Sequence, residues 1–439
     1  MGQTSKAGKL DDRHRALQPN ADRKHARQSQ PCVLLINRFG AALSASAHGL
    51  TKRSSMPPTG RLAGDLATML SETGFEPELL ADDVTRQPRS RILGYGRLAW
   101  RALWRLGGLR RHDQVAAMVV MSDPPMILVV MALIGRLFRV PVIYWCQDVY
   151  PDVIVGQVRP GRGLAQLLLK PLAMMHHWAM AQSAGVIVPS PCIKQRLLAA
   201  GFQGPVEVMS NWPERGLRPA ASKGCSVTHG HRLRLLYSGH YGQAHDLTDL
   251  VAAARLMNDK GMPIDVHITL SERGLARFHR RHQGAQLLDN VTVGRQVSEI
   301  NLQDHLAGPD MHVVSVRPGA EGAIFPCKAL AAMRIGRPIL LFGTGESSLA
   351  SLIDTHNAGK VVLPGMSEDL VGWFETVLHH AVDRPLDVSL DLPLLGQNAL
   401  AAGRALGFDQ GPTKLVSTVA DAALQMPGPT QLAPIFEVS

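Results

Sequence analysis

Residues able to bind an anion lie between Val313 and Leu340. An apolar strand there leads into a loop that contains glycines and the cations Arg317 and Lys328, and a helix of small residues begins at Ala329. Backbone N–H groups and the dipole at a helix N-terminus favour a phosphate, and a lysine adds a point charge. The loop lacks the spacing GxxxxGK[ST], so it does not predict an ATPase-type site. The alternative interpretation is an ordinary αβ connection with a solvated lysine.

Alternating strands and helices must position this loop. Apolar, strand-like runs separated by helical sequence recur from Cys32 to Val362, a pattern that predicts parallel sheets with helices on both faces. The Pro-, Gly- and Ser-rich stretch Asn211 to Arg232 divides them into two halves. We therefore expect an α/β fold with two doubly wound Rossmann-like domains and a cleft between them, where ligands bind at the carboxyl ends of the strands. The expected segments are a disordered tail (1–30), a first domain (31–215), a linker (216–231), a second domain (232–390), C-terminal helices that pack back on the first domain (391–425) and a tail (426–439).

Composition excludes several classes of protein. The chain has 439 residues, of which 45% are hydrophobic, so it can bury two cores. Its five cysteines are scattered without a CxxC pair, which argues against a zinc ribbon or a disulfide framework and fits a reducing compartment. The polar first thirty residues do not resemble a signal peptide. The most apolar region, Val115 to Val140, is interrupted by Asp123-Pro124-Pro125 and does not predict a transmembrane helix.

Most of the net charge of +10 comes from the first quarter of the chain. The segment Arg86 to Arg111 contains eight arginines and no acidic residue, interleaved with tryptophan and leucine. In a helix, Arg97, Arg101 and Arg105 share one stripe, and an apolar stripe runs beside them. Such a basic amphipathic helix suits an anionic membrane surface. The alternatives are a helix whose apolar stripe packs on its own domain, and nucleic acid, for which the sequence has no motif.

Several stretches, in order, resemble the glycosyltransferases of sequence family 4, which have the GT-B fold, and especially the colanic-acid and exopolysaccharide type. The resemblance covers residues 31 to about 425. It is carried by LLINRF, PPTGRLAGDLATMLSETGFEPELL, SDPP with YWCQDVYPDV, VIVPSPCIKQRLLAAG with VEVMSNWPE, LLYSGHYGQAHDLTDLVAAA, FPCKALAAMRIGRPIL and AGRALGFDQGPTKLVSTV. It implies transfer of a sugar from a nucleotide-sugar donor, with retained anomeric configuration and no metal or other cofactor.

The resemblance also implies which residues bind the donor. Gly239 matches the glycine after the first strand of the donor domain, and Gly242 follows it closely. His240 and His245 stand where the family usually has two basic residues. Arg317 and Lys328, the two cations of the glycine-containing loop between Val313 and Leu340, complete the expected donor site on the second domain.

Two carboxylates are the expected catalytic residues. Asp148 follows the buried run YWCQD and would meet the acceptor hydroxyl, or it is a helix N-cap or turn aspartate. The two family glutamates fall at Ala323 and Ala331, and Glu321 is the nearest acid. Thr59 to Arg61, and the long loop Gly40 to Pro58, are expected on the acceptor side.

The sequence thus predicts a cytoplasmic glycosyltransferase held on the inner face of the membrane through Arg86 to Arg111. It would act on a polyprenyl-diphosphate-linked saccharide in exopolysaccharide, capsule or lipopolysaccharide synthesis. One alternative is a non-catalytic homologue that binds glycan or nucleotide-sugar and acts as a scaffold, which the missing glutamates and the two histidines favour. Another is a nucleotide-sugar epimerase of the same fold, which the DPP, QD and PCK segments fit poorly.

Overall fold

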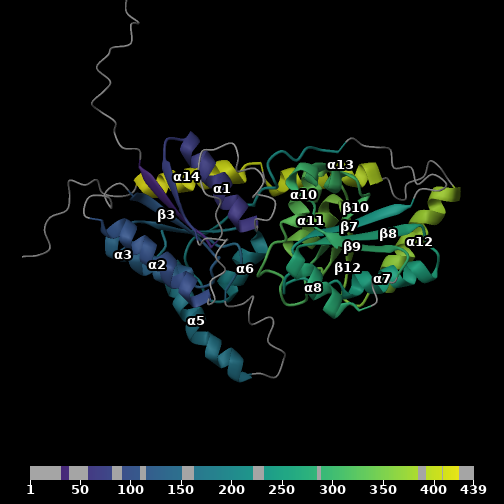
Figure 1. The fold of residues 1–439 in the computed structure, drawn as a ribbon, viewed down its shortest axis with the longest axis horizontal. Coiled ribbons are helices and arrows are strands. Elements are labelled where there is room, and N and C mark those ends of the chain that lie inside the picture. Colours follow the sequence, from purple (N-terminus) through teal and green to yellow (C-terminus); the bar gives the residue numbers. More distant parts are fainter. Residues whose placement is uncertain are drawn as a thin grey trace, which may run out of the picture.

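The chain folds into two α/β domains that lie side by side (Figure 1). The structure, a computed structural model, describes residues 31–38, 58–81, 91–108, 115–150, 163–220, 232–283, 288–383, 392–407 and 409–424. Each domain contains a six-stranded parallel sheet, and the two sheets have the orders β2-β1-β3-β4-β5-β6 and β12-β11-β10-β7-β8-β9. The expected architecture of two doubly wound domains is confirmed. The strands are β1 (Cys32–Ile36), β2 (Glu76–Leu80), β3 (Val115–Met121), β4 (Val142–Trp145), β5 (Gly185–Val188), β6 (Val206–Val208), β7 (Leu233–Gly239), β8 (Ile264–Leu270), β9 (Val291–Arg295), β10 (Met311–Ser315), β11 (Ile339–Phe342) and β12 (Gly359–Val362).

Helices cover both faces of each sheet, because the strands are apolar on both sides. Along β1, Leu34 and Ile36 point into one core cluster, whereas Val33 and Leu35 point into another. The helices are α1 (Pro58–Glu72), α2 (Arg91–Gly107), α3 (Ile127–Phe138), α5 (Gly163–Ala181), α6 (Pro191–Ala199), α7 (Thr248–Asp259), α8 (Glu272–Arg281), the 3-10 helix η4 (Glu299–Asn301), α9 (Leu302–Ala307), α10 (Lys328–Ile335), α11 (Ser348–His356), α12 (Ser367–Asp383), α13 (Leu392–Leu406) and α14 (Gly411–Leu424). In the first domain, α2, α3, α5 and α6 lie on one face of the sheet, and α1 and α14 lie on the other (Figure 1).

The two C-terminal helices belong to different domains, which corrects the expectation that both return to the first. Helix α13 packs on α10 and α11 of the second domain. Only α14 crosses back, where Leu415 and Val419 enter the core between α1 and β3. The crossing brings α14 close to the linker, since a Cβ at Gly411 would lie 2.3 Å from the carbonyl oxygen of Ser210. Glycine is therefore needed at this contact.

The side of helix α2 that faces the core overlaps only in part with the expected apolar stripe, which consisted of Ile92, Tyr95, Ala99, Leu103 and Leu106. Leu98, Ala102 and Leu106 are buried, whereas Trp100 and Trp104 are exposed. Arg105 also leaves the expected basic stripe, because its guanidinium pairs with Glu78 at 2.5 Å. The sequence pattern could not decide this, since the burial of a helix depends on its neighbours. None of the helices in the described ranges has the length and apolar character needed to cross a bilayer. The loop Gly40 to Pro58 lies outside the described residues except for Pro58.

Candidate functional site

Lys328 is held at the carboxyl edge of the second sheet by the loop that joins β10 to α10. It is the first residue of α10, and its Nζ donates hydrogen bonds to the Tyr237 hydroxyl and, at 2.8 Å, to the His240 carbonyl. The same atom lies 3.8 Å from the centroid of the Tyr237 ring. Burial lowers the pKa of Lys328 well below its ordinary value. The structure thus puts a half-buried amino group at a helix N-terminus, next to the end of β7.

Gly239, the last residue of β7, makes this approach possible. Its φ of 121° lies in the region that L side chains rarely adopt, and a Cβ there would come within 3.1 Å of Lys328 Cε. At Gly242 a Cβ would lie 3.0 Å from the His240 ring, so a side chain would displace that histidine. The two glycines keep the loop after β7 open around the amino group.

The two histidines of this loop are predominantly uncharged. The His240 side chain lies exposed at the edge of the site. The protein around it removes part of its hydration, and this desolvation, followed by the charges of Lys328 and Arg277, lowers its pKa. Burial and the charge of Lys328 hold the pKa of His245 well below its ordinary value. His245 Nδ1 lies 2.6 Å from the carbonyl oxygen of Ser315, which can only accept, so Nδ1 carries the proton of the neutral ring. The remaining nitrogen, Nε2, is then an acceptor rather than a donor.

Arg317 and Glu321 are both held by backbone contacts in the β10–α10 loop. The Arg317 backbone N–H donates to the carbonyl of Ala244 at 2.8 Å, which joins this loop to the one after β7. Glu321 Oε2 accepts from the Gly319 backbone N–H at 2.6 Å, and its carbonyl accepts from Arg196 of α6 at 2.7 Å. Glu321 therefore shapes the loop and links it to the first domain, and its expected catalytic role stays a prediction.

Two cations near the site were not among the expected residues. Arg273 and Arg277 of α8 lower the pKa of His240 through their charges, and the Arg277 guanidinium lies 5.7 Å from the centroid of the Tyr241 ring. Helix α8 follows β8, which is the neighbour of β7 in the sheet. The signal in the sequence was the basic run ERGLARFHRR directly after a strand. Its relevance depends on the strand order, which the sequence does not show.

Asp148 lies on the first domain where the two domains meet. Ser122 Oγ accepts from the backbone N–H groups of Gln147 and Asp148, both at 3.1 Å. Asp148 forms an isolated bridge with Ile324, next to the hydrogen bond from Val149 N–H to the Ala323 carbonyl at 2.9 Å. Burial, and then the charge of Asp123, raise the pKa of Asp148 from 3.8 to about 7. The two expected carboxylates thus lie on facing loops, and Asp148 is close to half ionised at neutral pH.

A pair of buried amides connects this loop to the linker. Gln147 Nε2 donates to Asn211 Oδ1 at 3.1 Å, and Asn211 Nδ2 donates back to Gln147 Oε1 at 2.5 Å. Asn211 Nδ2 also lies 3.7 Å from the sulfur of Cys327, the residue before Lys328. Contacts at one junction therefore position Asp148 and Lys328 relative to each other.

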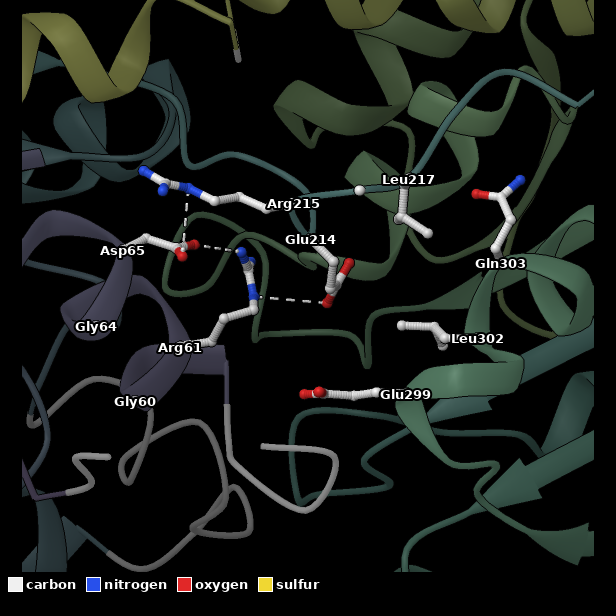
Figure 2. A pocket seen from close by; sticks show the side chains of 11 residues that line it. Gly60, Arg61, Gly64, Asp65, Glu214, Arg215, Leu217, Glu299, Leu302 and Gln303 are labelled. Atoms are coloured by element: carbon white, nitrogen blue, oxygen red, sulfur yellow. Dashed lines mark hydrogen bonds and ion pairs between the residues drawn. The ribbon is translucent and has the colours of Figure 1, made fainter. Parts of the chain in front are cut away.

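A pocket of about 300 Å³ lies beside this junction (Figure 2). It is lined by α1, the linker, η4 and α9. Two of its residues act on Cys327 electrostatically, since the charge of Arg61 lowers the pKa of that thiol and the charge of Glu214 raises it. Arg61 was expected to contact the acceptor or a phosphate. Its guanidinium instead binds Asp65 at 3.1 Å and the carbonyls of Trp212 and Pro213 at 2.8 and 3.1 Å. Arg61 therefore fastens the start of the linker to α1. Among the described residues, no group of His, Cys, Asp or Glu could hold a metal ion, and metal independence stays a prediction.

Comparisons with known proteins agree with the fold. Residues 59–212 match the family model described as "Glycosyl transferase 4-like domain". No curated protein matches the chain. Sucrose-phosphate synthase from Thermosynechococcus elongatus has a similar structure, with a TM-score of 0.65 and 14% identity over 90% of this chain and 100% of that one. HepE from Anabaena, in complex with UDP, has a TM-score of 0.58 and 14% identity over 89% of this chain and 99% of that one.

A third similar structure is WaaG, described as a glycosyltransferase involved in lipopolysaccharide biosynthesis. Its TM-score is 0.58 at 13% identity, over 88% of this chain and 99% of that one. At such identities the similar structures establish only the fold. The match to a glycosyl transferase 4-like domain indicates the type of reaction. The chain has the two-domain GT-B fold and carries a glycosyl transferase 4-like domain, which together support a glycosyltransferase enzyme.

Proposed function

We propose that the protein transfers a sugar from a nucleotide-sugar donor to a polyprenyl-diphosphate-linked saccharide, with retained configuration and without a bound metal. The product would be a bacterial exopolysaccharide, capsule or lipopolysaccharide, made on the cytoplasmic side of the membrane. The observation that carries the donor half is the position of Lys328. Its amino group lies at the N-terminus of α10 beside Gly239, where a diphosphate can approach the backbone.

The reaction breaks the bond between the anomeric carbon and a diphosphate oxygen, and it forms a bond from that carbon to an acceptor hydroxyl oxygen. Negative charge grows on the leaving diphosphate, so a preorganised cation and helix terminus stabilise the transition state more than the bound donor. Lys328 supplies the cation, and Arg273 and Arg277 add positive potential. In this proposal, Asp148 on the facing loop receives the proton of the acceptor hydroxyl.

The acceptor and the pathway are inferred from similar proteins. WaaG takes part in lipopolysaccharide biosynthesis, and the resemblance of this chain to the exopolysaccharide type points the same way. HepE was solved with UDP and with UDP-glucose, which makes a uridine diphosphate sugar the first donor to test.

Thermal unfolding of the purified chain with UDP, GDP, dTDP and CMP tests the donor half. A nucleotide at 100 times its dissociation constant adds about 2.7 kcal/mol to the free energy of unfolding. One nucleotide that raises the midpoint well above the other three would support the proposal and identify the donor class. A well-folded protein that none of them stabilises would contradict the proposal and favour the binding or scaffold role. The neutral His245 and the missing family glutamates are the observations that favour that role.

We also expect nucleoside diphosphate binding to weaken as pH rises from about 6 to about 9. In the free protein the pKa of His245 lies well below its ordinary value, so the ring is neutral at pH 7. A bound diphosphate favours the imidazolium, and binding then takes up a proton. Lys328 acts in the same direction, because its lowered pKa removes the cation as pH rises.

Titration calorimetry in buffers of different ionisation enthalpy measures that proton uptake. The substitution His245→Lys places a stronger base at this position, and we expect it to flatten the pH dependence that comes from the ring. His356→Gln, a histidine substitution at the end of α11, serves as the matched control and should leave the dependence intact. Equal wild-type affinity at low and high pH, with no proton taken up, would refute this coupling.

A further inference from the structure

The outer sides of α2, α3 and α5 form one surface of the first domain, which we call the apolar–basic face. Helix α3 packs against both α2 and α5, and the three lie on the opposite side of the sheet from α1 and α14 (Figure 1). Large apolar side chains project from all three helices into solvent. They are Trp100 and Trp104 of α2, Val130, Leu133 and Leu137 of α3, and Leu172, Met174, Met175 and Trp178 of α5.

The exposure of this face is too high to be incidental. Trp104 is 74% exposed, Met174 72% and Leu137 70%. In α3, Val130, Leu133 and Leu137 follow one another at helical spacing on the side away from the core. Scattered apolar residues are normal on a protein surface, but a group shared by three adjacent helices marks an interaction site.

The charges of the same helices are all of one sign. The sequences of α2, α3 and α5 contain no aspartate and no glutamate. The three helices instead carry exposed cations, which are Arg97 and Arg101 of α2, Arg136 and Arg139 at the end of α3, and Lys170 of α5. Exposed tryptophan, leucine and methionine on the same helices as arginine and lysine suit the boundary between acyl chains and anionic headgroups.

We propose that the apolar–basic face docks the protein on an anionic lipid bilayer, with α3 and α5 contributing as much as α2. The sequence had placed this role in Arg86 to Arg111 alone, whereas in the structure the exposed apolar residues extend from α2 over α3 and α5. The bilayer fits better than a second copy of the chain. A twofold dimer would pack two faces whose charges are all positive against each other, and their repulsion opposes association. The inference extends the proposed use of a lipid-linked acceptor.

Co-sedimentation of the full chain with vesicles tests this docking. We expect binding to vesicles of phosphatidylglycerol and phosphatidylcholine, weak binding to phosphatidylcholine alone, and loss of binding at high salt. Each basic side chain near an anionic surface changes partitioning by about a factor of five, so Arg136→Gln with Arg139→Gln should weaken vesicle binding about 25-fold. Leu133→Ser with Leu137→Ser on α3, and Trp104→Ser on α2, should weaken it to a similar degree.

Matched controls lie on the second domain. Arg255→Gln with Arg280→Gln changes the net charge equally, and Ile300→Ser removes an exposed apolar side chain of η4. Both should bind like the wild type. Thermal midpoints and nucleotide stabilisation, which involve other residues, show whether each variant is folded and keep this test separate from that of the donor site. A wild type that does not bind anionic vesicles would overturn the inference. So would control variants that lose as much binding as the face variants, or a dimer that Trp104→Ser dissociates without any vesicle binding.

Discussion

Replacing Lys328 with alanine should abolish the stabilisation by a nucleoside diphosphate and lower the transfer rate by about 10²- to 10³-fold, the usual effect of removing one preorganised group that stabilises an anionic transition state. The Nζ atom donates to the carbonyl of His240, the residue after β7, and α10 begins at Lys328. The free protein should keep its thermal midpoint, because the lost hydrogen bonds contribute only about 1 kcal/mol each and the cost of burying the amino group disappears with them. Thermal unfolding with and without the nucleotide, together with initial rates, measures both effects.

Two further variants make this result specific. Lys328→Arg retains the positive charge, but a planar guanidinium replaces the compact ammonium group beside Gly239. We expect this variant to bind the nucleotide more weakly than the wild type and more strongly than Lys328→Ala. Lys414→Ala removes an exposed lysine of α14 and should behave like the wild type. If Lys328→Ala retains full nucleotide stabilisation and full activity, the donor diphosphate does not bind where we place it.

Replacing Asp148 with asparagine should reduce transfer by about 10²- to 10⁴-fold, the range for a general base, while nucleotide stabilisation stays as in the wild type. The pKa of about 7 predicts that wild-type activity rises as pH increases through neutrality, because only the carboxylate can accept the proton of the acceptor hydroxyl. The residual activity of the variant should lack this rise. A variant as active as the wild type would assign Asp148 to the turn alone.

Stability gives an independent check with a definite sign. The pKa of Asp148 rises from 3.8 in the unfolded chain to about 7 in the folded one, so the unfolded chain binds fewer protons between these values. Wild-type stability therefore decreases as pH rises from about 4 to about 7, and the penalty is complete above that range. The side chain of the Asp148→Asn variant cannot ionise, so this variant should unfold at a higher temperature than the wild type at pH 8 but not at pH 4. Calorimetry at these two pH values compares them.

Local features of the chain predicted well the strands and the helix that surround the proposed donor site. The run that ends at Gly239, and the strand, loop and helix around Lys328, are defined by apolar residues, glycines and a helix stop close together in sequence. The end of β7 and the loop before Lys328 lie close together because the carboxyl ends of parallel strands share one edge of the sheet, where ligand sites lie. The fold was predictable for the same reason, because each strand is a short apolar run bounded by turn residues.

Features that depend on distant partners were not predictable. Arg61 binds carbonyls about 150 residues further along the chain, at Trp212 and Pro213. Arg273 and Arg277 approach His240 only because β8 lies next to β7. The tautomer of His245 is likewise set by the carbonyl of Ser315, 70 residues away, and not by its own sequence neighbours.

The return of α14 has a consequence for how the protein is made. The core between α1 and β3 is closed by Leu415, Val419 and Ala422, which are among the last described residues of the chain. While the ribosome is still translating, the second domain has all its strands, but the first lacks this helix and exposes an apolar face. The first domain, although synthesised first, is therefore completed only when α14 has emerged, and until then its exposed apolar face favours aggregation of the nascent chain.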